Sequence, residues 1–500
     1  MLVKRKWIAA ALLMMVACVA FGFGSPAKGE TAGSAAEKPP EVIPLEMLPP
    51  EAPEVIALRR QIEAEIDAYS ARLIEMNDWM YHNPESGYNE FKASRMMGEE
   101  LKKQGFEVKF GVEGLEDGYN EVIQERFGAG GLPTAFVAKY KGKTEHPVIA
   151  FMLESDALRA TPAPFHGCQH NMQGPVAIGS GVALAKVMEK NNIPGSVWVI
   201  HTPAEEIPPP DKSAMYKAGV FDEVDFLIRS HGATPKARRN KAGLGNCCML
   251  IEAVLYDFYG KPAHGTRAWQ GADALDAARL FFDAVDMLRE HSEPEFRFMG
   301  AITKTGDAPN VVDQHVQVDH WIRNANRAGA TALAKKAEQV DTIAKAAAMA
   351  TFTDVKIRHY ATYTNGIENG WLQALMWHYV NEYAGPEDKV AISEELGDPS
   401  GWAECGLPSV NVPGITIQAA TAGIPSVAGH SHENAAITIS PEGHKALVQM
   451  AKIGAAMGLR LVLEPELRAK INEHQGQWQA WGVKEGLIRE DMIRRDYRKK

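Results

Sequence analysis

The sequence predicts an α/β protein in which a mostly parallel sheet flanked by helices is interrupted by a smaller α+β domain. Short apolar segments at 134–140, 148–153 and 196–201 are separated by helical stretches such as 174–190. This alternation is typical of parallel strands covered by helices. Functional side chains in such sheets gather where the strands end.

The inserted domain is predicted from a change of pattern after residue 245. There, strand, helix, strand and helix alternate before one more strand, and the first pattern then resumes. The segments are strand-like at 248–259, 311–323 and 352–363, and helical at 272–289 and 328–350. We therefore expect a main domain in two parts, 56–245 and 368–465, an insert at 246–367 and a C-terminal extension at 466–500.

Composition limits the class of partner. The chain has 500 residues, of which 45% are hydrophobic, so it can bury a large core. Its formal net charge is −10, which gives no basic surface for nucleic acid. A small-molecule or peptide substrate is the simpler expectation.

The N-terminus reads as a targeting segment. Lys4, Arg5 and Lys6 precede an apolar run at 7–23, as in a secretory signal peptide, which we place at 1–30. The protein is then exported, to the periplasm or the extracellular space. Two alternatives keep it at a membrane: the run is retained as an anchor, or Cys18 carries a lipid. Residues 31–55, rich in Pro, Ala and Glu, are expected to form a disordered linker.

Acidic and histidine side chains follow the predicted strands. Asp156 comes after 148–153, Glu205 and Glu206 come after 196–201, and His231 comes after an apolar run at 224–228. Neighbouring side chains at a strand end point in different directions, so one carboxylate can bind a metal while the other contacts water. Without further context, two acids on a surface loop remain the alternative.

A thiol and an imidazole lie two residues apart directly before a predicted helix, at Cys168 and His170. Thiolate and neutral imidazole suit a divalent metal such as zinc. A buried structural pair and a Cys-His nucleophilic dyad are the alternatives. Together with Glu206, His231 and His430, these side chains come from successive sheet units, which favours a metal site at one sheet edge.

Longer motifs support this interpretation over roughly 66–461. They comprise Trp79, His82, Pro84, Glu85 and Glu90; Asp156-Ala157-Leu158; Gly167 to Asn171; Pro203 to Glu206; Gly260 to Gly265; Ala308 to Val312; and Gly429-His430-Ser431. As a set they resemble the metal-dependent aminoacylase and carboxypeptidase clan, metallopeptidase family twenty. The similarity is to its amidohydrolase branch, which includes the aminobenzoyl-glutamate hydrolases.

The resemblance implies a role for each matching residue. Cys168, His170, Glu206, His231 and His430 would bind two divalent metal ions, manganese or zinc, and Glu205 would activate a metal-bound water as general base. The insert would be a lid and dimerisation domain. Its His264 would stabilise the oxyanion in the neighbouring subunit, while Asn310 and Arg323 would hold the substrate carboxylate. A salt-bridged strand residue is the alternative for Arg323.

Besides Gly265, which stands in place of alanine, three features depart from the family pattern. Gln169 stands where glycine is usual, a stiff loop of Ile207 and three prolines follows Glu206, and an extra segment occupies 116–127. These departures leave the substrate preference and the choice of metal open.

The predicted function is hydrolysis of the amide bond of an N-acyl or N-aroyl amino acid, such as p-aminobenzoyl-glutamate. A dipeptidase or carboxypeptidase of the same clan is the enzymatic alternative. A non-catalytic metal-containing binding protein is the alternative from another class. The expected partners are a small-molecule substrate and a second copy of the chain, with no nucleic acid, and a membrane only if the N-terminal segment is retained or lipidated.

Overall fold

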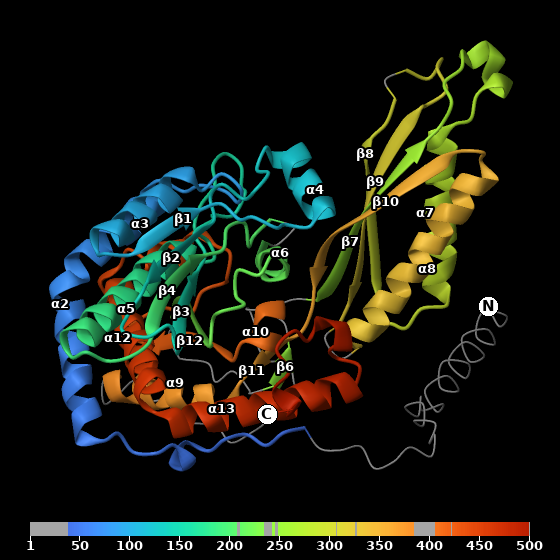
Figure 1. Cartoon of the computed structure of the whole chain (residues 1–500). Coiled ribbons are helices and arrows are strands. Elements are labelled where there is room, and N and C mark those ends of the chain that lie inside the picture. Colours follow the sequence, from blue (N-terminus) through green and yellow to red (C-terminus); the bar gives the residue numbers. More distant parts are fainter. Residues whose placement is uncertain are drawn as a thin grey trace, which may run out of the picture. The chain divides into compact units, whose positions relative to one another are not determined.

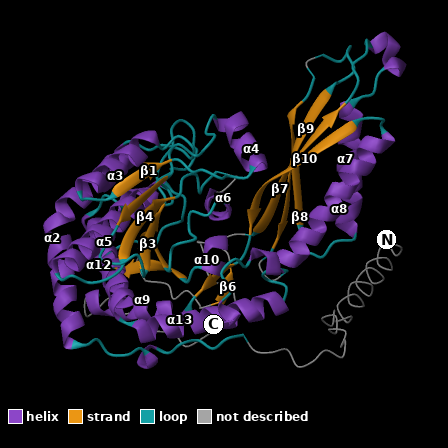
Figure 2. Ribbon diagram, viewed as in Figure 1, coloured by secondary structure: helices purple, strands orange, loops and turns teal. Residues whose placement is uncertain are grey.

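The computed structural model describes residues 39–207, 211–234, 243–245, 249–306, 308–325, 328–384, 406–421 and 423–499. The predicted signal peptide, Cys18 and the three prolines at 208–210 lie outside these residues. Within them, the predicted fold class is confirmed: a mostly parallel sheet with helices and a separate antiparallel sheet (Figures 1 and 2).

The larger sheet has eight strands among the described residues. Its central pairs, from β4 through β3, β5 and β12 to β11, are parallel, and both edges are antiparallel. The order is β1 (Glu107–Phe110), β2 (Phe136–Tyr140), β4 (Ser196–His201), β3 (Val148–Leu153), β5 (Phe226–Thr234), β12 (Gly414–Ala420), β11 (Gly366–Glu368), β6 (Gly243–Gly245).

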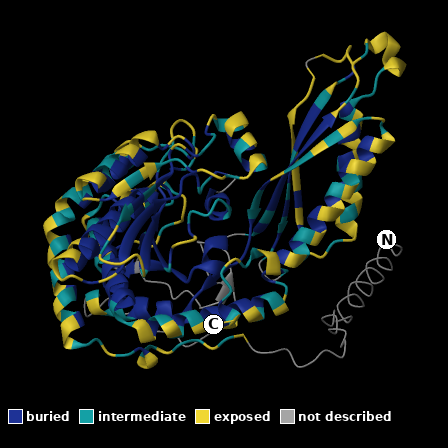
Figure 3. Ribbon diagram, in the orientation of Figure 1, coloured by how far each residue is buried: buried dark blue, intermediate teal, exposed yellow. Residues whose placement is uncertain are grey.

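Helices cover both faces of this sheet because its central strands are apolar on both sides. Odd-numbered residues of β3 pack into a core with α2 (Pro53–His82), α5 (His170–Lys190) and α12 (Pro441–Leu463). Even-numbered residues of β3 pack into a second core with α4 (Asp117–Phe127) and α6 (Asp211–Lys217). Figure 3 shows that β3, β4 and α5 are buried, whereas α2 has an exposed outer face.

The helix α12 is long and apolar enough to span a membrane by length and composition. Of its most apolar window, 83% is buried inside the protein, as in a central core helix. Outside the predicted insert, the other described helices are α3 (Phe91–Lys103), α9 (Gly370–Tyr383), α10 (Leu407–Asn411), α11 (His432–Ile437) and α13 (Pro465–Lys484). Four 3₁₀ turns lie at Leu45–Met47, Gly265–Gln270, Glu490–Met492 and Tyr497–Lys499.

The second sheet lies within the predicted insert and is antiparallel throughout. Helices α7 (Ala274–Glu290) and α8 (Gly329–Ala350) pack on one face. The strand order is β10 (Asp354–Tyr363), β7 (Leu250–Tyr259), β9 (His315–Asn324), β8 (Arg297–Lys304). The sequence predicted only three of these strands. It missed β8 because seven of its eight residues are exposed, so no apolar alternation marks it. The domain boundaries themselves stay predictions.

Two terminal segments differ from expectation. Residues 39–55 were predicted to be a disordered linker, but Leu48 is buried and Glu51 accepts a hydrogen bond of 2.6 Å from Tyr379. The C-terminal extension, for which the sequence indicated no packing, also joins the core. The helix α13 lies beside α9 (Figure 1), and its Trp478 is buried in an apolar cluster with Ile488. Enough apolar surface is therefore available at both ends to order them.

Candidate active site

Donor side chains gather at the edge of the larger sheet where the parallel strands β3, β4 and β5 end. Glu205 and Glu206 follow β4, whereas Cys168 and His170 lie at the start of α5. His231 was predicted to follow its strand, but β5 extends beyond it, so the sheet itself fixes this backbone. The observed site therefore draws on a strand and a helix as well as on loops.

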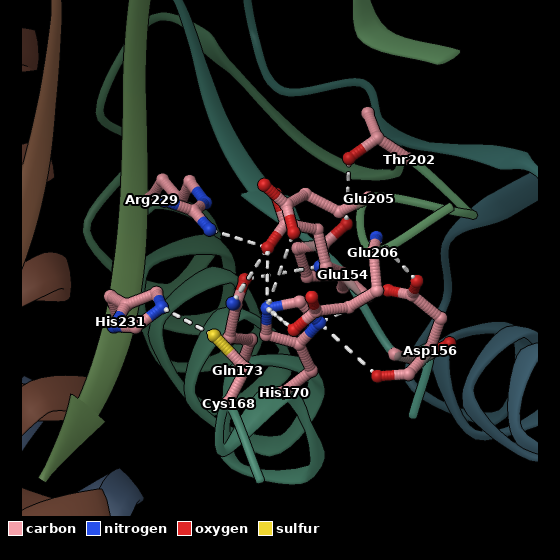
Figure 4. Close-up of polar contacts among 12 residues, drawn as sticks. Glu154, Asp156, Cys168, His170, Gln173, Thr202, Glu205, Glu206, Arg229 and His231 are labelled. Carbon is pink, nitrogen blue, oxygen red and sulfur yellow. Dashed lines mark hydrogen bonds and ion pairs between the residues drawn. The ribbon is translucent and has the colours of Figure 1, made fainter. Parts of the chain in front are cut away.

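Two overlapping groups of donor atoms include all five predicted metal ligands. Cys168, His170 and His231 form the first group, and Cys168, Glu206 and His430 form the second; the donor atoms of each group lie within 4.8 Å of one another. Sγ of Cys168 is 3.5 Å from Nε2 of His231 (Figure 4). Oε1 of Glu206 is 3.8 Å from Nε2 of His430. Because both groups share Cys168, they define two neighbouring positions for a cation.

Asp156 contacts the side chain of one donor residue and the backbone of another. Its Oδ1 lies 3.0 Å from Nδ1 of His170, and its Oδ2 accepts a 2.8 Å hydrogen bond from the backbone N–H of Glu206. A carboxylate on Nδ1 directs the other ring nitrogen to a metal. That nitrogen, Nε2 of His170, and Oε1 of Glu206 are buried and make no hydrogen bond among the described residues, although Nε2 lies 3.2 Å from the Glu154 carboxylate. Such atoms require a further partner, and a divalent cation fits them.

Burial sets the protonation of the donors. It raises the pKa of the Cys168 thiol to about 12. It also raises the pKa of Glu206 to about 7, and the charge of Glu205 adds to this effect. Burial lowers the pKa of His231 well below its usual range, and Arg229 lowers it further, so the ring is neutral. A cation would stabilise the thiolate and the carboxylate and would be bound by the neutral imidazole. Mixed sulfur, nitrogen and oxygen donors suit zinc, while carboxylate and imidazole also admit manganese.

Glu205 adjoins both groups without belonging to either. Its Oε2 lies 4.0 Å from Nε2 of His170, and its side chain is 17% exposed, compared with 8% for Glu206. A carboxylate beside the cation positions, but reachable by solvent, can take a proton from a water molecule. The two neighbouring acids therefore differ in what they can do.

Sequence reasoning missed a buried ion network beneath the site. The Glu154 carboxylate contacts Nζ of Lys212 and Nη2 of Arg229, and it lies 3.2 Å from Nε2 of His170. Burial opposes ionisation of Glu154, but Arg229 and Lys212 outweigh it and hold the pKa well below its usual range. Glu154 can also be grouped with His170 and Glu205, yet the two cations already neutralise it. A charged residue inside an apolar strand, Arg229, was the available signal.

Comparison with known proteins identifies the family. No protein-family model matches the chain. The Xaa-Arg dipeptidase of Mus musculus is 30% identical over 378 residues, which are 73% of this chain and 80% of that protein. A p-aminobenzoyl-glutamate hydrolase subunit of Escherichia coli (strain K12) is 30% identical over 354 residues, 67% of each chain. The chain belongs to the M20 metallopeptidase and amidohydrolase family.

A solved structure supports the M20 fold. The aminobenzoyl-glutamate utilization protein from Klebsiella pneumoniae aligns with a TM-score of 0.57 at 18% identity, over 80% of this chain and 98% of that one. As an M20 protein, the chain is a metallohydrolase that acts on peptide or amide bonds.

Gln169, where the M20 pattern usually has glycine, does not enter the donor groups. Its backbone is left-handed, with φ of 64°, a conformation that favours glycine. Its amide Nε2 donates to the backbone oxygen of Asn434 at 2.8 Å, and its Oε1 accepts from the backbone N–H of Ala233 at 2.6 Å. The side chain thus ties the start of α5 to α11 and β5, and the predicted effect on pocket shape is indirect.

The residues predicted to act from the insert stand apart from the M20 donor groups. His264 precedes the turn Gly265–Gln270 and accepts a hydrogen bond from the backbone N–H of Thr266. Asn310 is exposed, and its backbone oxygen accepts from Gly265. Arg323 lies in β9 opposite Ile251. Among the contacts of the described residues, none joins these side chains to the donors, so their roles stay predictions.

Proposed function

We propose that the protein is an exported, metal-dependent amidohydrolase that cleaves the amide bond of N-acyl or N-aroyl amino acids, with Glu205 as general base. The observation that carries this proposal is the difference between the two adjacent acids. Glu206 belongs to a donor group with Cys168 and His430, whereas Glu205 is in neither group that contains Cys168 and is more exposed to solvent. The relative that hydrolyses p-aminobenzoyl-glutamate, by its name, supports the substrate class. Export rests on the charged and apolar pattern of residues 4–23.

In this proposal the five donors hold two divalent ions, manganese or zinc. Such ions lower the pKa of water and polarise a carbonyl group. Glu205 takes a proton from the attacking water and passes it to the leaving nitrogen. His264 of a neighbouring subunit donates a hydrogen bond to the oxyanion, and Asn310 and Arg323 hold the substrate carboxylate.

A dipeptidase is the second candidate. It is favoured by the Xaa-Arg dipeptidase of Mus musculus, which matches a larger share of this chain than the p-aminobenzoyl-glutamate hydrolase does at the same identity. The two candidates differ in what precedes the scissile bond. An acyl or aroyl group stands there in the first, and a residue with a free amino group stands there in the second.

A substrate panel tests the proposal. Purified protein is assayed on N-acyl amino acids, p-aminobenzoyl-glutamate and dipeptides ending in arginine, before and after chelation and with Mn²⁺ or Zn²⁺ restored. We expect the protein to release a free amino acid, and this activity to be lost on chelation and recovered when metal is restored. The rate of release should be higher for N-blocked substrates than for dipeptides. Faster cleavage of dipeptides would replace the first candidate by the second. No turnover by metal-loaded protein would overturn both.

We also propose a homodimer formed through the insert. Its sheet ends in the edge strand β8, where Met299 and Ile302 are 52% and 42% exposed. On α7, Leu280 and Met287 are also exposed. An unpaired apolar edge next to an apolar helix face is a self-complementary surface that a two-fold pair can bury.

Replacing Ile302 by Lys is expected to convert the dimer to a monomer, because the charge would be buried against its copy. Activity is expected to fall by at least about 100-fold if His264 acts across the dimer. Analytical ultracentrifugation and the amidohydrolase assay measure the two effects. Phe91→Lys, at a 52% exposed residue on α3, is the matched control and should change neither. A wild-type monomer with full activity would contradict the proposal.

A further inference from the structure

We propose that Glu90 is a positioning residue that holds the turn at 203–206 and so aims Glu205 and Glu206 at the donor groups. This inference rests on the proposed function of Glu205. Glu90 precedes α3 and is fully buried. Its Oε1 accepts a 2.7 Å hydrogen bond from the backbone N–H of Ala204, 114 residues along the chain. Its Oε2 accepts from the hydroxyl of Thr134 at 3.1 Å.

Ala204 needs such a partner because its backbone is strained. It is fully buried, with a left-handed φ of 59°, a conformation in which a Cβ is crowded. Strained residues of this kind persist only where the surrounding structure holds them. A buried N–H without a partner would add a further cost. The Glu90 carboxylate satisfies that N–H and thereby stabilises the turn in this conformation.

The loop before Glu90 packs against the same turn. A Cβ placed on Gly87 would lie 2.9 Å from Cα of Ala204 and 3.1 Å from its Cβ, so the two backbones are in close contact. On the other side, Asp156 accepts from the backbone N–H of Glu206 at 2.8 Å. The turn is thus fixed at Ala204 and at Glu206, and the side chain of Glu205 projects from between these two anchors.

The role of Glu90 is to accept hydrogen bonds rather than to carry charge. Burial, with the charge of Asp156 adding to it, raises the pKa of Glu90 to about 8, so a neutral side chain is compatible with its place at neutral pH. Glu90 is absent from the donor groups found among the described residues. A glutamine keeps an oxygen that accepts from Ala204. Its amide NH₂ would donate to the Thr134 hydroxyl, which reverses that hydrogen bond. Because the bond to Ala204 is the one that holds the turn, glutamine should replace Glu90.

The test compares Glu90→Gln with Glu90→Ala. Because Glu90 is fully buried and would act only through the turn, we expect the Ala variant to lose about 100-fold in kcat, the scale of a small misplacement of a catalytic group. KM should stay within about threefold. Its affinity for Zn²⁺ alone, measured by chelator competition, should fall at least about tenfold, as for loss of an orienting group. The Gln variant should keep kcat and Zn²⁺ affinity within about threefold of wild type.

A second substitution keeps the test decisive. Ala204→Gly removes the crowded Cβ, so the turn can form without help. Added to Glu90→Ala, it should recover at least about tenfold of the lost kcat, which a general loss of folding would not allow. The inference would be overturned if Glu90→Gln lost as much kcat as Glu90→Ala. Full activity of Glu90→Ala would also overturn it. The two proposals fail in different ways. If the wild-type protein turns over no substrate, the proposed function is wrong. If Glu90→Ala leaves the Zn²⁺ affinity unchanged, the positioning role is wrong, whether or not the protein is active.

Discussion

Replacing Glu205 by Gln is expected to lower kcat by about 10²- to 10⁴-fold, because an amide cannot take a proton from water. The bound metal is expected to stay at the wild-type level, since neither donor group that shares Cys168 includes Glu205. The substitution is isosteric and the side chain is partly exposed, so folding should be unaffected. Steady-state kinetics and metal content per chain, measured by plasma mass spectrometry, check the two expectations.

Two other acids, Glu206 and Glu433, serve as controls. Glu206→Gln should lose metal as well as turnover, because Glu206 is one of the donors. Glu433→Gln, at an exposed position on α11, should change neither. Turnover that survives Glu205→Gln would show that another group is the base. A wild-type protein that binds metal without any turnover would instead support the non-catalytic binding protein.

The parts of the fold that the sequence predicted are those whose burial follows a local pattern. The residues of β3 and β4 are all buried, and their apolar runs of six residues show this directly. By contrast β1 and β8 were missed, because half or more of their residues face solvent. An edge strand is defined by its pairing with a neighbour, which a local pattern does not record.

The site residues likewise fall into those that short sequence motifs predicted and those that only the tertiary fold brings together. Cys168 and His170 stand two residues apart, and Glu205 and Glu206 are adjacent, so their chemistry is visible in short motifs. The hydrogen bond from Ala204 to Glu90 joins residues that are 114 positions apart. The left-handed conformation at Ala204 is also not indicated by the sequence, because the residue is not a glycine. Interactions of this kind arise only from the tertiary fold. The role predicted for His264 would depend on a second chain, so the contacts of a single chain do not test it.

The ion network beneath the site leads to the largest expected change in stability. Glu154→Gln is expected to lower the free energy of unfolding by about 3 to 5 kcal/mol, because it leaves two cations buried without their carboxylate. The side chains of Glu154, Lys212 and Arg229 are 0%, 2% and 1% exposed. Urea unfolding of chelated protein measures the change.

Removing one of the cations separates charge from packing. The double variant Glu154→Gln with Lys212→Met has one buried cation fewer than Glu154→Gln alone, so it should recover at least about 1 kcal/mol of the lost stability. Glu75→Gln removes an exposed partner of Arg72 and should change stability by less than about 0.5 kcal/mol. If Glu154→Gln cost no more than this surface control, the network would contribute no net stability. Its persistence would then reflect the fixing of His170, whose Nε2 it contacts, rather than the folding of the sheet.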